Sequence, residues 1–229
     1  MRKDTLKTLL DASRERRALV LVTPLSHGDE RIFGEQAPGE DHPLAGEIAA
    51  CLRTGRSRIF ETDEGEFFLH AILPAPRLII IGATHIAQVL VRLAREVGVE
   101  PLIIDPRTAF ATQQRFDEAD IIDKWPGEAL GELGLDRHSA LVCLAHVPDI
   151  DDEALCAALR GECFYIGALG SKRSHAKRVK RLTARGFSEQ EISVIHAPIG
   201  LDIGSLGPSE IALSIIAEVV KVMRERNGD

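Results

Sequence analysis

The spacing of apolar positions along the chain changes near residue 75. Before that point, the pattern predicts two amphipathic helices, at 3–16 and 43–53. It also predicts four short strands, at 18–23, 31–34, 57–60 and 67–73. After it, short apolar runs alternate with helical segments, the runs at 78–81, 102–104, 121–122, 140–145 and 164–166 and the helices at 86–97, 152–159, 172–185 and 208–226. Short apolar strands separated by helices are typical of βαβ units and a parallel sheet.

The segment Pro74-Ala75-Pro76 is a stiff, extended connector and marks the expected domain boundary. The pattern therefore predicts an α/β protein of two parts. A small α+β domain covers residues 1–75, and a Rossmann-like domain with a parallel sheet covers residues 76–229.

Composition narrows the class of protein. The formal net charge of −7 disfavours general nucleic-acid binding, and no run approaches the apolar length of a membrane-spanning helix. The charged N-terminal helix lacks the apolar core of a signal peptide. None of the four cysteines forms a CxxC pair, and Cys143 lies in an apolar run, which favours a reducing compartment. We therefore expect a cytoplasmic protein with neither nucleic acid nor membrane as a partner.

The first candidate binding segment is the turn between residues 78–81 and the next helix. Gly82 supplies the tight turn, and Ala87 is small enough for close helix–strand packing, as in a dinucleotide-binding turn. Thr84 stands where such a turn has its second glycine, so the full GxGxxG pattern is absent. His85 adds a hydrogen-bonding side chain to the same turn. The alternative interpretation is a plain βα turn with an exposed histidine.

Two further candidates follow the next strands. Asp105 ends the second strand of this domain, 23 residues after Gly82, where an acid can accept hydrogen bonds from ribose hydroxyls. Arg107 offers a planar guanidinium to a phosphate. His146 follows the fourth strand and is a candidate base or ligand donor. The alternatives are an Asp–Pro turn with a surface arginine and an ordinary loop histidine.

The fourth candidate, at residues 164–175, is again a strand, a glycine-containing turn and a helix start. Gly167 and Gly170 precede Ser171, a natural N-cap, and the cations Lys172 and Arg173 then occupy the first helical turn. Cations oppose the positive end of a helix dipole, so an anion bound there would explain them. The helix then continues with basic side chains, which form either a solvated face or a docking surface: Lys177, Arg178, Lys180, Arg181 and Arg185.

The remaining polar and apolar segments give weaker evidence for a ligand. The apolar loop from Ile195 to Pro208, which contains His196, is either a lid over the crevice or an ordered connector packed on the sheet. The acids at 151–153 are interpreted as favourable charges at a helix N-terminus. His146, Asp149 and Asp151 lack any specific ligand spacing, so no metal site is predicted.

Two long motifs resemble those of the XdhC/CoxI family. They are Phe164-Tyr165-Ile166-Gly167-Ala168-Leu169-Gly170-Ser171-Lys172-Arg173 and Ile195-His196-Ala197-Pro198-Ile199-Gly200-Leu201-Asp202-Ile203-Gly204, the second followed by Pro208-Ser209-Glu210-Ile211-Ala212. The resemblance covers residue 77 to the last helix, with Gly82, Asp105 and His146 in the expected order. Family members typically carry an N-terminal Gly-Gly-Cys motif, which this chain lacks, so no cysteine role is carried over to Cys51.

The resemblance implies an accessory chaperone that performs no turnover chemistry of its own. Such a protein binds the molybdenum cofactor, as molybdopterin or its dinucleotide form, and assists its sulfuration with a cysteine desulfurase. It then helps to insert the cofactor into a xanthine dehydrogenase-type molybdenum hydroxylase, and it is usually a homodimer. The predicted binding residues are those of the four candidate segments and the second motif: Gly82, Thr84, His85, Asp105, Arg107, His146, Gly167, Gly170, Ser171, Lys172, Arg173 and His196.

Two other functions remain open from the residues alone. The Gly82 turn and Asp105 are compatible with an NAD(P)-binding oxidoreductase, although Thr84 weighs against it. The basic helix after Ser171 is compatible with a non-catalytic nucleotide-sensing adaptor that docks an acidic partner.

Overall fold

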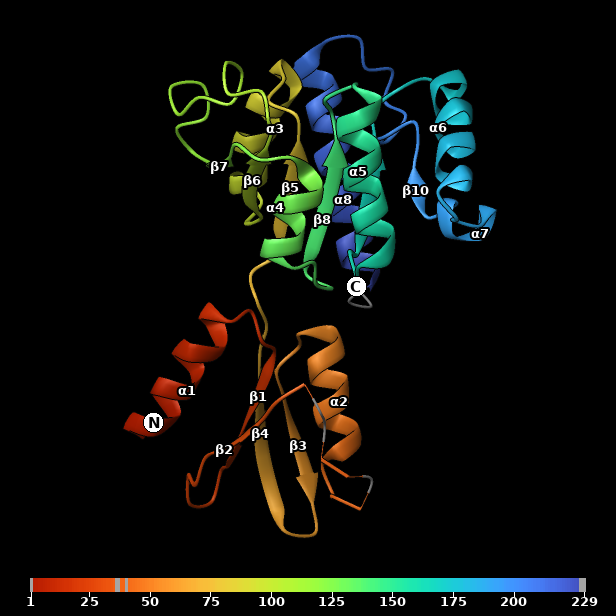
Figure 1. Cartoon of the computed structure of the whole chain (residues 1–229). Helices are drawn as coiled ribbons and strands as arrows, with labels where there is room; N and C mark the ends of the chain where they lie inside the picture. Colours follow the sequence, from red (N-terminus) through yellow and green to blue (C-terminus); the bar gives the residue numbers. More distant parts are fainter. Residues whose placement is uncertain (1, 36–37, 40, 227–229) are drawn as a thin grey trace. The chain divides into compact units, whose positions relative to one another are not determined.

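The computed structural model describes residues 2–35, 38–39 and 41–226, which form two compact units. The first unit ends at Ala75, and the second covers Pro76–Arg224 (Figure 1). Each unit has its own sheet and its own apolar core, so each is described by itself.

The first unit is a four-stranded antiparallel sheet with two helices. Its strand order is β2-β1-β4-β3, with β1 at Leu19–Pro24, β2 at Arg31–Phe33, β3 at Arg58–Thr62 and β4 at Gly65–Ile72. Helix α1 is Lys3–Arg14, and helix α2 is Ala45–Thr54, which ends at Gly55 in the left-handed conformation. Apolar residues of α2, among them Ile48 and Cys51, pack with Val20, Val22 and Leu69 of the sheet. This arrangement gives the predicted small α+β unit.

The second unit is a six-stranded sheet in which every pair of neighbouring strands is parallel. The strand order is β10-β9-β8-β5-β6-β7, with β5 at Arg77–Ile81, β6 at Glu100–Ile104, β7 at Asp120–Ile122, β8 at Ser139–Cys143, β9 at Tyr165–Ala168 and β10 at Ile195–His196. The chain builds outward from β5 to one edge and then from β8 to the other. This is the Rossmann order, and its switch point lies between β5 and β8. The predicted α/β class is confirmed.

Helices cover both faces of this sheet (Figure 1). One face carries α3 at His85–Glu96 and α8 at Pro208–Arg226, and the other carries α4 at Pro126–Leu133, α5 at Pro148–Arg160, α6 at Lys172–Ala184 and the short α7 at Glu189–Ile192. Along β5, Leu78 and Ile80 face the first layer, whereas Ile79 and Ile81 face the second. Because successive strand side chains point to opposite faces, a strand covered on both sides is apolar throughout.

Three elements were not predicted from the sequence. They are α4, α7 and β10, the last of which replaces the first two residues of an expected loop with a strand paired to β9. Helix α5 also begins at Pro148, four residues earlier than expected, because proline is well suited to the first position of a helix. Within the described chain, no helix is both long and apolar enough to cross a membrane.

Candidate ligand site at the carboxyl edge of the sheet

The predicted binding residues gather where the parallel strands end. In a parallel sheet all carboxyl ends share one edge, and α3, α5 and α6 begin there after β5, β8 and β9. Helices α3 and α6 pack on opposite faces of the sheet, so the segments they start share this edge and flank the end of β8.

The turn after β5 is filled by protein groups. Gly82 has a φ of +105°, and a Cβ atom there would lie 2.5 Å from the backbone nitrogen of Ala145. Thr84 caps α3, its side chain accepting a hydrogen bond from the backbone N–H of Ala87 at 3.3 Å. His85 is the first residue of α3 and is exposed. Gly82 therefore permits a close contact between the turn and the end of β8 across the switch point.

Asp105 ties this turn to the end of β6. Its buried carboxylate accepts hydrogen bonds from the N–H of Ala83 at 2.8 Å and from Arg107 through the backbone N–H at 3.0 Å, Nε at 2.9 Å and Nη2 at 2.7 Å. Burial acts to raise the pKa of this carboxyl, but the hydrogen bonds from Arg107 and Ala83 outweigh it and hold the pKa below its usual value. Both carboxylate oxygens thus have protein partners.

His146 follows β8 in a conformation that is uncommon for a residue with a side chain. Its φ is +58°, in the left-handed region, and its side chain is exposed at the carboxyl edge. Such conformations cost about 1–3 kcal/mol and cluster at functional sites. The geometry therefore singles out His146 among the candidates beside the switch point.

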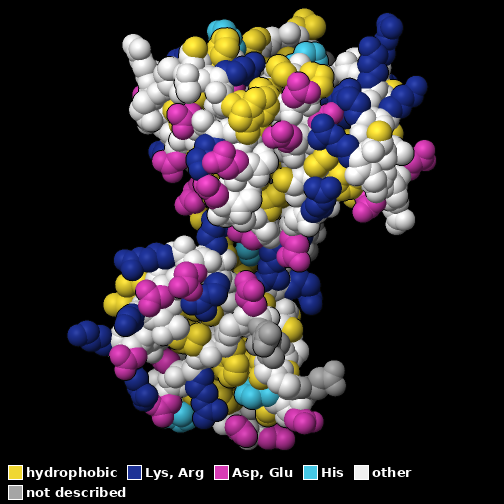
Figure 2. Space-filling model, in the orientation of Figure 1, with side chains coloured by type: hydrophobic (Ala, Val, Ile, Leu, Met, Phe, Trp, Pro, Cys, Tyr) yellow, Lys and Arg dark blue, Asp and Glu magenta, His cyan; other side chains and the backbone are white. Residues whose placement is uncertain are grey.

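The start of α6 is open to solvent. Gly170 has a φ of +137°, and Ser171 caps the helix by accepting a hydrogen bond from the N–H of Ser174 at 3.3 Å. Lys172 and Arg173 follow as exposed side chains in a first turn that holds no acid. Figure 2 shows Lys and Arg side chains gathered over the region that α6 occupies in Figure 1.

Helix α6 has two different sides. On the side toward α7, Lys172 and Lys180 border a shallow hollow together with Glu189. On the opposite side, Arg178 and Arg181 face α5. From the sequence we expected Lys172 and Arg173 to face the same groove as Gly82 and Asp105. The hollow beside Lys172 is instead lined by residues of α6 and α7 and contains neither of those two residues.

Two basic residues of α6 and two acids of α5 have internal roles that the sequence did not reveal. Arg181 donates to the buried carboxylate of Asp152 from Nε at 2.5 Å, with a second bond at 2.9 Å, and Arg178 donates from Nη2 to the carbonyl of Leu169 at 2.9 Å. Asp151 lies in the first turn of α5, as expected of a helix-terminal acid, but it is also buried beside α6. Asp152 has a role that the sequence did not reveal, as the buried partner of Arg181.

The second motif is an ordered connector at its start. His196 stacks on Tyr165 with ring centroids 4.5 Å apart, and its Nδ1 lies 3.2 Å from Oε1 of Glu218 on α8. The other oxygen of Glu218 accepts from the hydroxyl of Tyr165 at 2.5 Å and from the N–H of Gly200 at 2.9 Å. Glu218, which was not singled out from the sequence, thus fixes the connector.

Gly167 serves this packing. A Cβ atom on Gly167 would come within 2.5 Å of the Ile199 side chain, so the glycine leaves room for the connector on β9. Farther along the connector, Ile203 and Leu206 are 51% and 92% exposed. The ordered interpretation therefore holds for the first half of the segment, and the second half is accessible.

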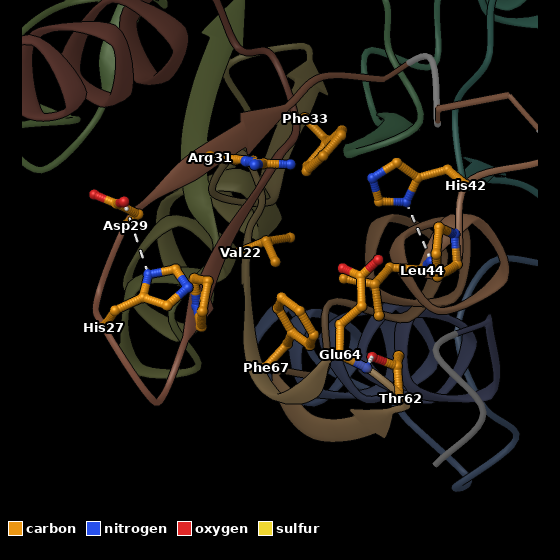
Figure 3. A pocket seen from close by; sticks show the side chains of 12 residues that line it. Val22, His27, Asp29, Arg31, Phe33, His42, Leu44, Thr62, Glu64 and Phe67 are labelled. Atoms are coloured by element: carbon orange, nitrogen blue, oxygen red, sulfur yellow. Dashed lines mark hydrogen bonds and ion pairs between the residues drawn. The ribbon is translucent and has the colours of Figure 1, made fainter.

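A separate pocket lies in the first unit, on the sheet beside α2 (Figure 3). Its lining includes the apolar side chains of Val22 and Phe67, and two of its polar side chains, His27 and His42, have partners within the protein. His27 lies 3.7 Å from Asp29, and Nδ1 of His42 accepts from the N–H of Leu44 at 3.1 Å. None of the predicted binding residues lies in this pocket. No group of three metal-ligating side chains occurs in residues 2–35, 38–39 and 41–226.

Comparison with known proteins supports the resemblance seen in the two motifs. Residues 78–219 match the family model of the XdhC Rossmann domain. Over 158 residues the chain is 34% identical to a probable xanthine dehydrogenase subunit of Bacillus subtilis, in a match that covers 69% of this chain and 46% of that protein. Over 156 residues it is 31% identical to the molybdenum cofactor insertion chaperone PaoD of Escherichia coli, in a match that covers 68% and 43%.

A solved structure resembles both units. The crystal structure of a xanthine dehydrogenase from Bacillus halodurans matches with a TM-score of 0.69 and 29% sequence identity, over 97% of this chain and 65% of that one. The chain thus spans less than half of the two curated relatives and under two thirds of the solved one. Because the family model covers more than half of the residues, from β5 to α8, the chain belongs to the XdhC family.

Proposed function

We propose that this protein is an accessory chaperone that holds the molybdenum cofactor at the carboxyl edge of the second unit for a xanthine dehydrogenase-type enzyme. Two observations support the proposal together. The chain belongs to the XdhC family, one of whose members is named as a cofactor insertion chaperone. The single geometric observation that carries it is the open start of α6, where exposed Lys172 and Arg173 occupy a first turn without acids.

The residues at this edge suit a phosphorylated pterin. A helix N-terminus with two added cations attracts a phosphate, and the exposed Ser171 leaves its approach open and polar. The exposed His146, which borders a pocket together with Ser174 of α6, offers a hydrogen bond to the polar edge of a pterin ring. When bound, the cofactor would supply the redox centre of the recipient enzyme, while this chain would bind it, orient it and shield it.

Asp105 distinguishes this function from a nicotinamide-dependent one. An oxidoreductase of Rossmann type uses an acid at this position to accept hydrogen bonds from a ribose. Here the carboxylate is fully buried and already accepts bonds from Ala83 and Arg107. The proposed chaperone does not require that acceptor, and the predicted role of Asp105 in cofactor binding is replaced in our proposal by a role in holding the turn.

The test is mass spectrometry of small molecules released from the protein after purification from cells that make molybdopterin. We expect a pterin in the wild type and less of it in the Lys172→Gln, Arg173→Gln double variant. Arg92→Gln combined with Arg95→Gln removes the same charge from exposed positions of α3, away from the start of α6, and serves as the control. Wild-type protein that carries no pterin, or that carries NAD(P) instead, would contradict the proposal.

Delivery is tested with a recipient enzyme. We propose that the partners are a molybdenum hydroxylase apoenzyme and a cysteine desulfurase. Addition of the cofactor-loaded protein is expected to restore hydroxylase activity, and omission of the desulfurase is expected to leave the enzyme incompletely active. Full activity of the hydroxylase in cells lacking this protein would contradict the delivery role.

A further inference from the structure

A small pocket between the first turn of α5 and the inner side of α6 has an unusual set of polar atoms. It measures about 140 Å³ and is bordered by His146, Pro148 and Asp151 on one side and by Ser174, Lys177 and Arg178 on the other. One water molecule occupies about 30 Å³ of liquid, so the pocket has room for a tetrahedral anion.

Arg178 brings unpaired N–H groups to this pocket. Its side chain is only 4% exposed, and Nε and Nη1 are buried with no hydrogen-bond partner in the protein. The two neighbouring arginines at this edge differ, because Arg107 is bonded to Asp105 and Arg181 to Asp152 through two nitrogens each. Buried unpaired N–H groups of a charged side chain are costly, and the guanidinium fork matches a phosphate.

Asp151 brings an unpaired carboxylate oxygen to the same pocket. It is 2% exposed, and its Oδ1 is buried without a partner, although Arg178 is close enough to influence its charge. Arg178 and Asp151 carry opposite charges and line the same pocket, yet Nε and Nη1 of the arginine and Oδ1 of the aspartate remain unpaired. A bound group between the two side chains would pair these atoms. That group must accept hydrogen bonds from the arginine and donate one to the carboxylate.

The pocket is lined by more cations than acids, with Lys177, Arg178 and Arg181 against Asp151. Val147, the N-cap of α5, supplies no side-chain cap, and Asp149 and Asp151 in the first turn partly offset the positive end of the helix dipole. The exposed Lys177 adds a cation at the mouth. The pocket therefore favours an anion overall, despite the presence of Asp151.

We propose that this pocket binds a protonated phosphate group, either of a phosphate monoester or of inorganic phosphate. A phosphate with one proton has acceptor oxygens for Arg178 and Lys177 and an O–H for the free oxygen of Asp151. Sulfate has the same size and shape but carries no proton near neutral pH, so it meets the carboxylate with a bare oxygen. The inference does not depend on the molybdenum cofactor, because phosphate chemistry alone defines it.

The experiment is calorimetric titration of the full chain, purified from cells that make no molybdopterin, with inorganic phosphate and with sulfate. We expect phosphate to bind at least about tenfold more tightly than sulfate, since one hydrogen bond to a charged group is at stake. Asp151→Asn is expected to weaken phosphate binding and to abolish most of this preference. Arg178 is left unchanged, because it also holds the carbonyl of Leu169.

A matched pair of variants separates the pocket from general charge. Lys177→Gln should weaken both anions to a similar extent, whereas Lys180→Gln, on the opposite side of α6, should weaken neither. A parallel titration with glycerol 3-phosphate at about pH 6, where much of the ester keeps one proton, identifies the source: tighter binding of the ester indicates a phosphorylated ligand, and tighter binding of the free ion indicates phosphate itself. Equal binding of phosphate and sulfate by the wild type, no phosphate binding, or an unchanged preference in Asp151→Asn would overturn the proposal.

Discussion

Two segments of the second unit share one local plan, a parallel strand, a glycine turn and a capped helix, yet only one of them is open. In the turn after β5, the N–H of Ala83 bonds to Asp105 and Gly82 lies against Ala145. At the start of α6, Ser171, Lys172 and Arg173 are exposed. The same motif thus serves stability at one site and remains accessible at the other. The difference lies in the neighbouring side chains, since a buried acid bonds to the first turn, whereas the first turn of α6 contains no acid of its own.

The largest expected effect is on the closed turn. Gly82→Ala combines a left-handed backbone with a Cβ atom 2.5 Å from the backbone of Ala145, and we expect a loss of about 3–5 kcal/mol in the free energy of unfolding. Urea denaturation measures it. Gly98→Ala is the control, because Gly98 also has a positive φ of +75° but no atom within 4 Å of the added carbon. Similar losses in the two variants would show that Ala145 does not constrain the turn.

The next effect concerns the acid that closes the turn. Asp105→Asn leaves Arg107 without its buried counter-charge, and a loss of about 3 kcal/mol is expected at pH 7. Because the pKa of Asp105 is lowered in the folded state, its contribution is present above about pH 4 and is lost as the pH falls below it. The gap between wild type and variant should therefore shrink in acid. A gap that does not change with pH would contradict this account.

A smaller change in stability, this time a gain, is expected for Asp151, which lies beside α6. Burial, helped by the nearby charge of Asp152, raises the pKa of Asp151 to about 6. The positive charge of Arg178 and the backbone N–H groups of His146 and Ala145 act in the opposite direction but do not outweigh burial. A raised pKa means that ionisation destabilises the fold as the pH rises from about 4 to 6. Asp151→Asn should therefore be about 2 kcal/mol more stable than the wild type at pH 7 and not at pH 4. Thermal unfolding at both pH values, without added phosphate, measures it.

The smallest effect is expected at the start of α6. Replacing Lys172 and Arg173 by glutamine removes two cations from the positive end of a helix, so stability should rise by about 0.3–1 kcal/mol. The Lys180→Gln, Arg185→Gln double variant, which removes cations nearer the other end, should bring no such gain. Loss of stability in the first variant would indicate that those cations hold the fold together.

The sequence predicted the sheet better than the contacts within the site. Apolar runs bounded by turns identified β5, β6, β7, β8 and β9. The signal is clearest for β5, β8 and β9, which are short and buried along their whole length. The two-residue strand β10 was missed, since its placement depends on pairing with β9. The pair of Asp152 and Arg181 is separated by 29 residues, and only packing of α5 on α6 brings it together.

The glycines show the same limit. Gly82 and Gly170 were recognised as turn residues, and both have the positive φ that such turns require. Gly167 was assigned to ligand binding from its motif, but the structure shows that Ile199 fills the space where a side chain would be. A residue that must be small looks the same in a sequence whether a ligand or a neighbouring segment approaches it.

Glu218 of α8 anchors a segment that is synthesised before it. Its carboxylate receives bonds from Tyr165 and Gly200 and pairs with His196, all of which leave the ribosome before it does. These bonds form only after α8 has emerged and folded back, so the connector gains this part of its anchorage late in translation.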